Sequence, residues 1–154
     1  ELEARILQAL AVNKSERVLE VGTGSGYLPA LLAARAHHVC SVEINPRLKA
    51  FGESNLHRAG VENITTDLGD ASRGWPKYAP YDVVVLTGST PVLPEGLSAQ
   101  LKAGGRLFAV VGDPPAMEAQ LITRVSEGDC RTTGLFETCL APLKNAPRPA
   151  RFEF

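Results

Sequence analysis

The sequence predicts an α/β sandwich, in which a mostly parallel central sheet carries helices on both faces and antiparallel strands follow at the carboxyl end. Two observations support this fold class. Segments with helical apolar spacing alternate with short β-rich segments up to about residue 111. The segment 81–86, which contains VVVL, is apolar without alternation, as is typical of a strand buried on both faces of a parallel sheet.

Helices and strands alternate in the first half of the chain. Apolar spacing predicts a helix near the amino terminus and another after a glycine-rich loop, and a strand follows each, at 17–21 and 39–43. Pro46 favours the first turn of a third helix, which runs toward Gly60 and precedes a strand at 63–67. The apolar positions of the three helices are Leu2, Ile6, Leu7 and Leu10; Leu28, Leu31, Leu32 and Ala36; and Leu48, Phe51 and Leu56, of which the last three are expected to be buried.

The second half begins with a loop at 69–80 that is rich in glycine and proline, and the strand 81–86 follows. A loop with two prolines then leads to a short helix at 95–101. Gly104 and Gly105 are expected to stop this helix before a fifth strand at 106–111. The segment 118–140 lacks a helical period and contains β-favouring runs such as LITRV, so we expect antiparallel strands there.

Composition narrows the class of protein. The 154 residues suit one domain, and because the first residue is Glu1 rather than methionine, we expect that domain, 1–154, to be truncated at its amino terminus. A net charge of -1 gives no broad field for binding nucleic acid or an anionic membrane. No segment resembles a secretory leader or a membrane span. We therefore expect a cytoplasmic protein, whereas the oligomeric state does not follow from the sequence.

The three cysteines do not form a recognisable metal or disulfide motif. Cys40, Cys130 and Cys139 are odd in number, lie among apolar residues and lack CxxC spacing. Free thiols in a reducing compartment are the expected state, and no metal site is predicted.

The stretch VLEVGTGSGY at 18–27 places Gly22, Gly24 and Gly26 directly after the first strand. Such a loop lets the backbone approach a ligand at the carboxyl ends of parallel strands. A dinucleotide fingerprint requires glycine where Tyr27 stands, and a phosphate-binding loop requires a Gly-Lys-Ser/Thr sequence that is absent. The remaining interpretation is a nucleoside without a pyrophosphate; a plain strand-to-helix turn is the alternative.

Two acidic residues follow the next strands. Glu43, at the end of the second strand, suits the two ribose hydroxyl groups, and Asp70, after the third, suits an adenine amino group. Taken singly, Glu43 is equally compatible with a solvated acid, and Asp70 is more often a turn former. Together with the glycine loop they indicate a nucleoside site.

These residues belong to longer motifs. VLEVGTGSGY, SVEINP, GDASRGWPKYAPYDVVVLTGSTPVLP and LKAGGRLFAVVG, in this order, resemble the S-adenosylmethionine-dependent methyltransferases, and specifically the protein-L-isoaspartate O-methyltransferase family. The resemblance extends from about Glu3 to at least Leu143 and implies a Rossmann-like methyltransferase sandwich. It also implies S-adenosyl-L-methionine as the cofactor, with an isoaspartyl-containing peptide or protein as its substrate. The cofactor-binding residues that it implies are Glu20, Gly22, Thr23, Gly24 and Gly26 for the methionine part, Glu43 for the ribose, Asp70 and Ala71 for the adenine, and Ile44 beside Glu43.

The sequence departs from this family in two ways. Ala71 stands where the family usually has glycine, which adds a methyl group near the adenine. Family members also carry, upstream of the region that matches Glu1, a segment with a Gly-Gln-Thr-Ile-Ser-type motif that closes over the cofactor, and this motif is absent from the sequence. We therefore expect this chain to bind the cofactor but to methylate isoaspartyl peptides poorly.

The implied chemistry needs positioning more than it needs a base. An α-carboxylate with a pKa of about 3.3 to 3.7 is already ionised at neutral pH. His37, His38 and His57 are accordingly interpreted as structural or surface residues. Ser89 and Thr90, expected in the loop after the fourth strand, are the candidates for contact with the substrate. Arg73 and Lys77 are either carboxylate anchors or ordinary solvated charges.

Three other functions share some of these features. A nicotinamide oxidoreductase is disfavoured by Tyr27 and by the lack of room for a substrate domain. A methyltransferase with another acceptor would have the same cofactor motifs. A cofactor-binding module without catalysis would also lack the upstream segment.

Overall fold

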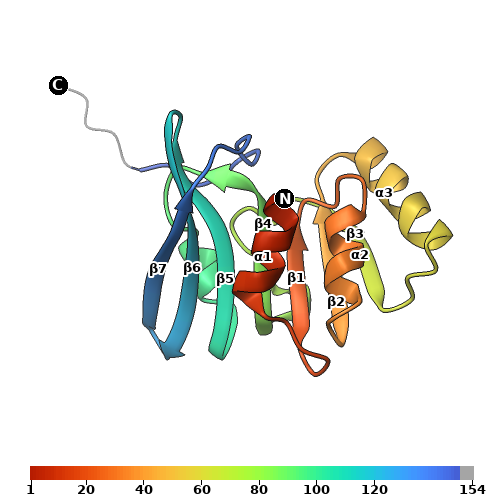
Figure 1. Ribbon diagram of the computed structural model, residues 1–154, viewed down its shortest axis with the longest axis horizontal. Helices are drawn as coiled ribbons and strands as arrows, with labels where there is room; N and C mark the ends of the chain where they lie inside the picture. The colour runs from red at the N-terminus through yellow and green to blue at the C-terminus, as the bar shows by residue number, and fades with distance from the viewer. Residues whose placement is uncertain (150–154) are drawn as a thin grey trace.

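The computed structural model describes residues 1–149 and contains one seven-stranded sheet with the order β3-β2-β1-β4-β5-β6-β7 (Figure 1). The first five strands in chain order pair in parallel, and β6 and β7 are added antiparallel. This confirms the predicted sheet. The strands are β1 (Arg17–Val21), β2 (His38–Glu43), β3 (Ile64–Leu68), β4 (Tyr81–Thr90), β5 (Leu101–Asp113), β6 (Ala116–Ser126) and β7 (Asp129–Glu137).

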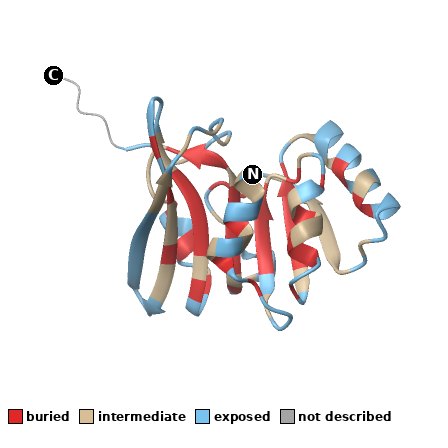
Figure 2. Ribbon diagram, in the orientation of Figure 1, coloured by how far each residue is buried: buried red, intermediate tan, exposed pale blue. Residues whose placement is uncertain are grey.

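Helices cover both faces of the sheet and create two separate cores. The helices are α1 (Leu2–Leu10), α2 (Tyr27–Ala33), α3 (Pro46–Arg58) and α4 (Glu95–Ser98), with a 3-10 turn η1 at Pro76–Tyr78. Figure 1 shows α1 and α2 in front of the sheet. They bury Leu10 and Leu32 against Val83 and Phe108 on this face. On the other face, Leu97 of α4 belongs to the second core. Figure 2 shows buried residues concentrated in the inner strands, while β7 at the edge is largely exposed.

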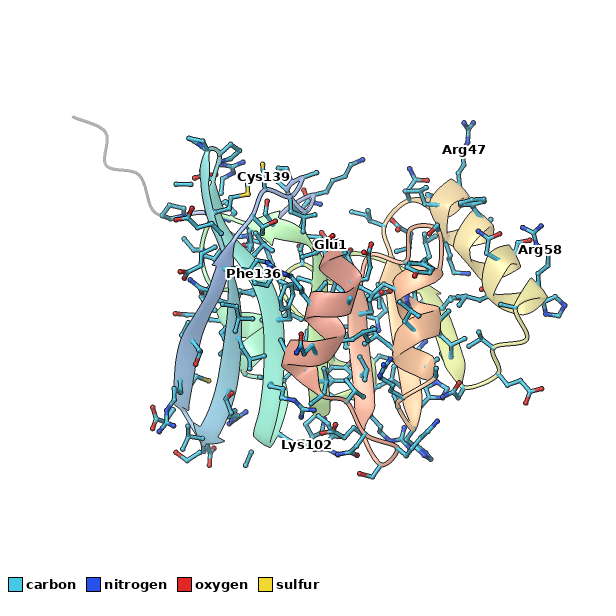
Figure 3. All side chains as sticks on the ribbon, viewed as in Figure 1. Glu1, Arg47, Arg58, Lys102, Phe136 and Cys139 are labelled. Carbon is cyan, nitrogen blue, oxygen red and sulfur yellow. The ribbon has the colours of Figure 1, made fainter. Side chains whose placement is uncertain are left out.

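Helix α3 differs from the prediction in the face that it buries. Leu48 and Phe51, expected in the core, are 43% and 53% exposed, whereas Gly52 and Leu56 are buried. The reason is the glycine loop, because a Cβ atom on Gly52 would lie 2.7 Å from both the Gly24 carbonyl oxygen and the Thr23 side chain. The helix therefore turns its smallest residue to the loop. Arg47 and Arg58, near its two ends, project into solvent (Figure 3).

The helix predicted at 95–101 ends at Ser98, and Gly104 and Gly105 lie within β5 rather than before it. Tyr81 pairs with Leu101 but Val83 pairs with Arg106, so residues 102–105 form a bulge opposite β4. A Cβ atom on Gly105 would lie within 3.1 Å of the carbonyl oxygens of Lys102, Asp82 and Tyr81. The two glycines thus permit a close approach between backbones within a strand. In sequence alone, a glycine pair in this role looks the same as one that ends a helix.

The start of the chain is fixed to the sheet by an ion pair. The Arg106 guanidinium donates to both carboxylate oxygens of Glu16 at 2.8 Å and also to the Leu10 and Ala11 carbonyl groups at the end of α1.

None of the helices described over residues 1–149 has the length and apolar character needed to cross a membrane.

Candidate functional site

The glycine loop that joins β1 to α2 depends on left-handed backbone conformations. Gly22, Gly24 and Gly26 have φ angles of 105°, 53° and 88°. Gly22 is the most constrained, because a Cβ atom there would overlap the Thr87 hydroxyl group. That hydroxyl donates to the Val21 carbonyl at 2.6 Å and lies 3.2 Å from the Gly22 carbonyl. The loop is therefore tied to the carboxyl end of β4.

Glu43 joins the loops that follow β1 and β2. Its Oε1 accepts from the Gly24 amide at 3.1 Å, and its Oε2 accepts from the Asn45 amide at 3.0 Å. The residue is only 6% exposed. A nearly buried carboxylate with two backbone donors has a fixed orientation, and its remaining lone pairs can accept further hydrogen bonds. The isolated solvated acid considered from sequence is therefore not what the fold contains.

Asp70 is held by a turn and by a distant segment. Its Oδ1 accepts from the Ser72 amide at 3.0 Å and the Ser72 hydroxyl at 2.7 Å, and its Oδ2 accepts from the Asn145 side chain at 2.9 Å. Partial burial raises the pKa of this carboxyl group, but the hydrogen bonds from Ser72 and Asn145 and the nearby Arg73 charge outweigh it, so the pKa lies below its ordinary value. Asp70 is therefore ionised at neutral pH.

A pocket at the carboxyl edge of the sheet brings these elements together. Its empty volume of about 340 Å³ includes space that is open to solvent. Five of the predicted residues line it: Gly22, Glu43, Ile44, Asp70 and Ala71. Its other lining residues are Val21, Val42, Gly69, Ser72, Leu143 and Lys144. The loops after β1, β2 and β3 thus meet at one site, as parallel strands require.

The other predicted residues of the loop lie outside the lining of this pocket. Thr23 is 2% exposed, and Gly24 and Gly26 belong to the part of the loop that faces α3. Glu20 does not line the pocket either: it is fully buried beneath the loop and accepts from the Ser41 hydroxyl at 2.7 Å. Burial, reinforced by the charge of Glu43, raises the pKa of Glu20 well above its ordinary value despite that hydrogen bond.

Ser89 and Thr90 also differ from the prediction. They belong to β4, which continues to Thr90, and are at most 2% exposed. The Ser89 hydroxyl donates to the Leu140 carbonyl at 2.9 Å and the Thr90 hydroxyl to the Val92 carbonyl at 2.8 Å. Both hydroxyl groups are therefore used within the fold rather than presented to a substrate.

The carboxyl-terminal segment supplies pocket residues that sequence reasoning missed. The Ser89 amide donates to the Ala141 carbonyl and the Leu143 amide donates to the Ser89 carbonyl, both at 2.9 Å. This pairing brings Leu143 and Lys144 to the pocket. In the sequence, Gly88 is the residue that hints at this pairing. A Cβ atom there would lie 2.8 Å from the Leu143 side chain, so the close approach of the segment requires glycine.

The histidines and cysteines lie apart from this pocket. His37 and His38 are at the amino end of β2, where the His38 ring nitrogen is 2.8 Å from the Thr65 hydroxyl, and His57 is exposed on α3. Cys130 and Cys139 are exposed, contrary to the apolar surroundings expected for them, and only Cys40 is buried. Cys139 follows β7 (Figure 3). Among residues 1–149, no three His, Cys, Asp or Glu side chains gather as they would around a metal ion.

Comparison with known proteins identifies the family. A model of the family described as protein-L-isoaspartate(D-aspartate) O-methyltransferase matches residues 1–146. The chain belongs to this family. Among protein-L-isoaspartate O-methyltransferases, it is 42% identical over 125 residues to one from Syntrophobacter fumaroxidans and 43% identical over 141 residues to one from Methanoculleus marisnigri. These alignments cover 81% and 91% of the chain but 58% and 63% of the relatives, so the chain spans about three fifths of their length.

Solved structures in the same family have the same fold. One protein-L-isoaspartate O-methyltransferase superposes with a TM-score of 0.85 at 28% identity, covering 94% of this chain and 47% of the other. A Plasmodium falciparum protein, described as a putative member in complex with S-adenosyl-L-homocysteine, superposes with a TM-score of 0.80 at 21% identity, covering 93% and 73%. The arrangement is thus a Rossmann-like methyltransferase sandwich.

Proposed function

We propose that this chain is a methyltransferase domain that binds S-adenosyl-L-methionine and that its methyl acceptor is the carboxylate of an L-isoaspartyl residue in a peptide or protein. The observation that carries the proposal is the convergence of Gly22, Glu43 and Asp70 on one pocket. Membership of the isoaspartate methyltransferase family supports the acceptor.

The donor set of the pocket fits this cofactor. The fixed Glu43 carboxylate can accept from the two ribose hydroxyl groups, and the ionised Asp70 can accept from the adenine amino group. Ile44 and Ala71 offer apolar surface for the base, and the bare backbone at Gly22 allows the methionine part to approach closely. A dinucleotide fits less well, because Tyr27 stands where the fingerprint of a pyrophosphate-binding loop requires its third glycine.

For this reaction, the protein has to position the two reactants and exclude water from them. The cofactor supplies an electrophilic methyl group, and an isoaspartyl carboxylate is ionised at neutral pH without a general base. Bringing the two reactants to about 3 to 3.5 Å in line is then the main contribution of the enzyme. Nothing in this chemistry requires the histidines, which lie apart from the pocket.

Two further expectations remain proposals. One is that 1–154 constitutes a single domain. The other is a reducing, cytoplasmic location, which is supported by the free thiols of Cys40, Cys130 and Cys139.

Calorimetry with S-adenosylhomocysteine tests the cofactor assignment. Glu43→Gln removes the negative charge that accepts from the ribose, and charge-assisted hydrogen bonds of about 1.5 to 3 kcal/mol each correspond to at least a tenfold increase in Kd. Glu53→Gln, on the exposed side of α3, is the matched control and is expected to leave the Kd unchanged. Equal Kd values for the folded Glu43→Gln variant and the native protein would contradict the site, as would preferential binding of NAD.

The acceptor is tested separately with labelled cofactor. An isoaspartyl peptide should accept label at the low rate expected from the sequence, whereas the same peptide with a normal aspartyl residue should accept none. Cofactor binding with label transfer to neither peptide, or to both equally, would contradict the isoaspartyl assignment and leave the cofactor site intact.

A further inference from the structure

Three buried side chains form a continuous hydrogen-bonded chain beneath the glycine loop. Ser41 Oγ donates to Glu20 Oε1 at 2.7 Å, and Thr23 Oγ1 lies 2.6 Å from Ser41 Oγ. Because Ser41 has one hydroxyl hydrogen and uses it toward Glu20, Thr23 is the donor in the second bond. All three residues are at most 2% exposed, so water does not compete for these bonds. These hydrogen bonds therefore connect the glycine loop, through Ser41 of β2, to Glu20 of β1.

The acid at the end of this chain is costly for the fold. Glu20 Oε2 is buried and has no hydrogen-bond partner among residues 1–149, and its neighbours in β1, Val18, Leu19 and Val21, are apolar core residues. Burial raises the pKa of Glu20 well above its ordinary value, which reflects the cost of placing a carboxylate at this position. An unpartnered polar atom at a position that suits leucine calls for a functional explanation.

The loop needs an anchor of this kind. Three of its five residues are glycines, which have no side chain, and the Ser25 side chain remains local, 3.4 Å from the Tyr27 amide. Within the described part of the chain, Thr23 is the loop residue whose side chain bonds inward to the sheet, through Ser41 of β2. It thereby complements the backbone contacts that Thr87 and Glu43 make to the same loop.

We infer that Glu20, Ser41 and Thr23 are positioning residues, in which the hydroxyl chain anchored on Glu20 holds the glycine loop in the conformation that receives the cofactor. The inference rests on the proposed function for its ligand. The anchoring itself is a property of the free protein and can be measured without ligand.

Ser41→Ala tests the chain at its centre, because Ser41 is fully buried and does not line the pocket. We expect the Kd for S-adenosylhomocysteine to rise about fivefold or more, the equivalent of one net hydrogen bond. We also expect faster amide hydrogen exchange at 22–26 in the free protein. Ser98→Ala is the matched control: it removes another buried hydroxyl, which bonds to the Glu95 carbonyl within α4, and should change neither measurement.

Two substitutions of Glu20 distinguish a positioning role from simple filling of the core. Glu20→Gln retains the shape and an acceptor oxygen for Ser41, so it should keep the native Kd and the slow exchange of the loop. Glu20→Leu suits the apolar surroundings but removes the acceptor, so it should reproduce the Ser41→Ala phenotype. If Glu20 merely filled the core, leucine would serve at least as well as glutamine.

The inference is overturned if Ser41→Ala and Glu20→Leu both retain the native Kd and the native exchange at 22–26. Loss of thermal stability alone, of the size seen in Ser98→Ala, also counts against it. If the native protein fails to bind S-adenosylhomocysteine, the proposed function falls, and hydrogen exchange at 22–26 still decides whether the anchor exists.

Discussion

The Asn145 side-chain amide donates to the Asp70 carboxylate at 2.9 Å, although the two residues are 75 positions apart. The main-chain carbonyl of Asn145 accepts in turn from Arg73 Nε at 3.3 Å and lies 3.1 Å from the Ser72 hydroxyl, whose one hydrogen is used toward Asp70. The carboxyl-terminal segment is therefore fastened to the loop after β3 through two hydrogen bonds. One of these uses Asp70 Oδ2, the oxygen that does not accept from Ser72.

Asn145→Ala should tighten binding of S-adenosylhomocysteine. The adenine amino group and the Asn145 amide are both N–H donors for Asp70, so a ligand no longer has to displace the amide. The gain is up to about fivefold, the equivalent of one net hydrogen bond, and calorimetry measures it. Arg148→Ala, on the exposed part of the same segment, is the control. Weaker binding by Asn145→Ala would mean that Asn145 orients Asp70 instead.

Substitution of Gly22 and of Gly24 by alanine should lower the free energy of unfolding by different amounts. Both residues have positive φ angles, but a Cβ atom at Gly22 overlaps the Thr87 hydroxyl, whereas the space around Gly24 is open to 4 Å. We expect urea unfolding to show a loss of about 1 kcal/mol for Gly24→Ala and about 3 kcal/mol for Gly22→Ala, because only the second displaces Thr87 from its carbonyl acceptors. Similar losses for both variants would contradict this role of Thr87.

Glu16→Gln should destabilise the protein at neutral pH and not in acid. The hydrogen bonds from Arg106 hold the pKa of Glu16 below its ordinary value of 4.5, so this carboxylate stabilises the fold above that value and loses its effect as the pH falls through the folded pKa. The variant should unfold about 1 to 2 kcal/mol more easily at pH 7 and match the native protein once the pH has fallen below the folded pKa of Glu16. A difference that is independent of pH would rule out the ion pair as its cause.

Glu20 should give the opposite pH dependence. Its pKa is raised in the folded state, so between the ordinary value of 4.5 and the folded pKa the unfolded chain has lost a proton that the folded chain retains. Native stability should then fall with rising pH by about 1.4 kcal/mol per unit over that interval. Glu20→Gln lacks this dependence, so urea unfolding from pH 5 to pH 8 should show the stability difference shifting toward glutamine. Parallel curves would mean that Glu20 is ionised in the fold.

Local patterns in the sequence were sufficient for most of the fold. The first strand was predicted with the bounds that the structure has, Arg17–Val21, because a β-rich run lies between a polar turn and a glycine loop. Leu48 and Phe51 were assigned to the wrong face because their spacing is helical in either case. What decides the face of α3 is the contact between Gly52 and the glycine loop, which is not local.

In the candidate site too, local sequence patterns predicted some residues, whereas others depend on contacts between distant segments. Gly22, Glu43 and Asp70 could be grouped from sequence because parallel strands deliver their following loops to one edge. Leu143, Lys144 and Asn145 could not, since they reach the site through backbone pairing with Ser89, which leaves no pattern in the side chains. Ser89 itself was misassigned to a loop because its polar character does not reveal that its hydroxyl bonds to Leu140.

The position of Leu143 and Lys144 in the pocket wall has a consequence for biosynthesis. A chain emerging from the ribosome acquires β1 and its glycine loop early, but the pocket lacks one wall until residues 141–144 have emerged and paired with Ser89. A small molecule that needs this wall cannot stabilise the earlier intermediates of the nascent chain. It acts only after residues 141–144 have paired with Ser89, when its binding would slow local opening and protect the chain from proteolysis.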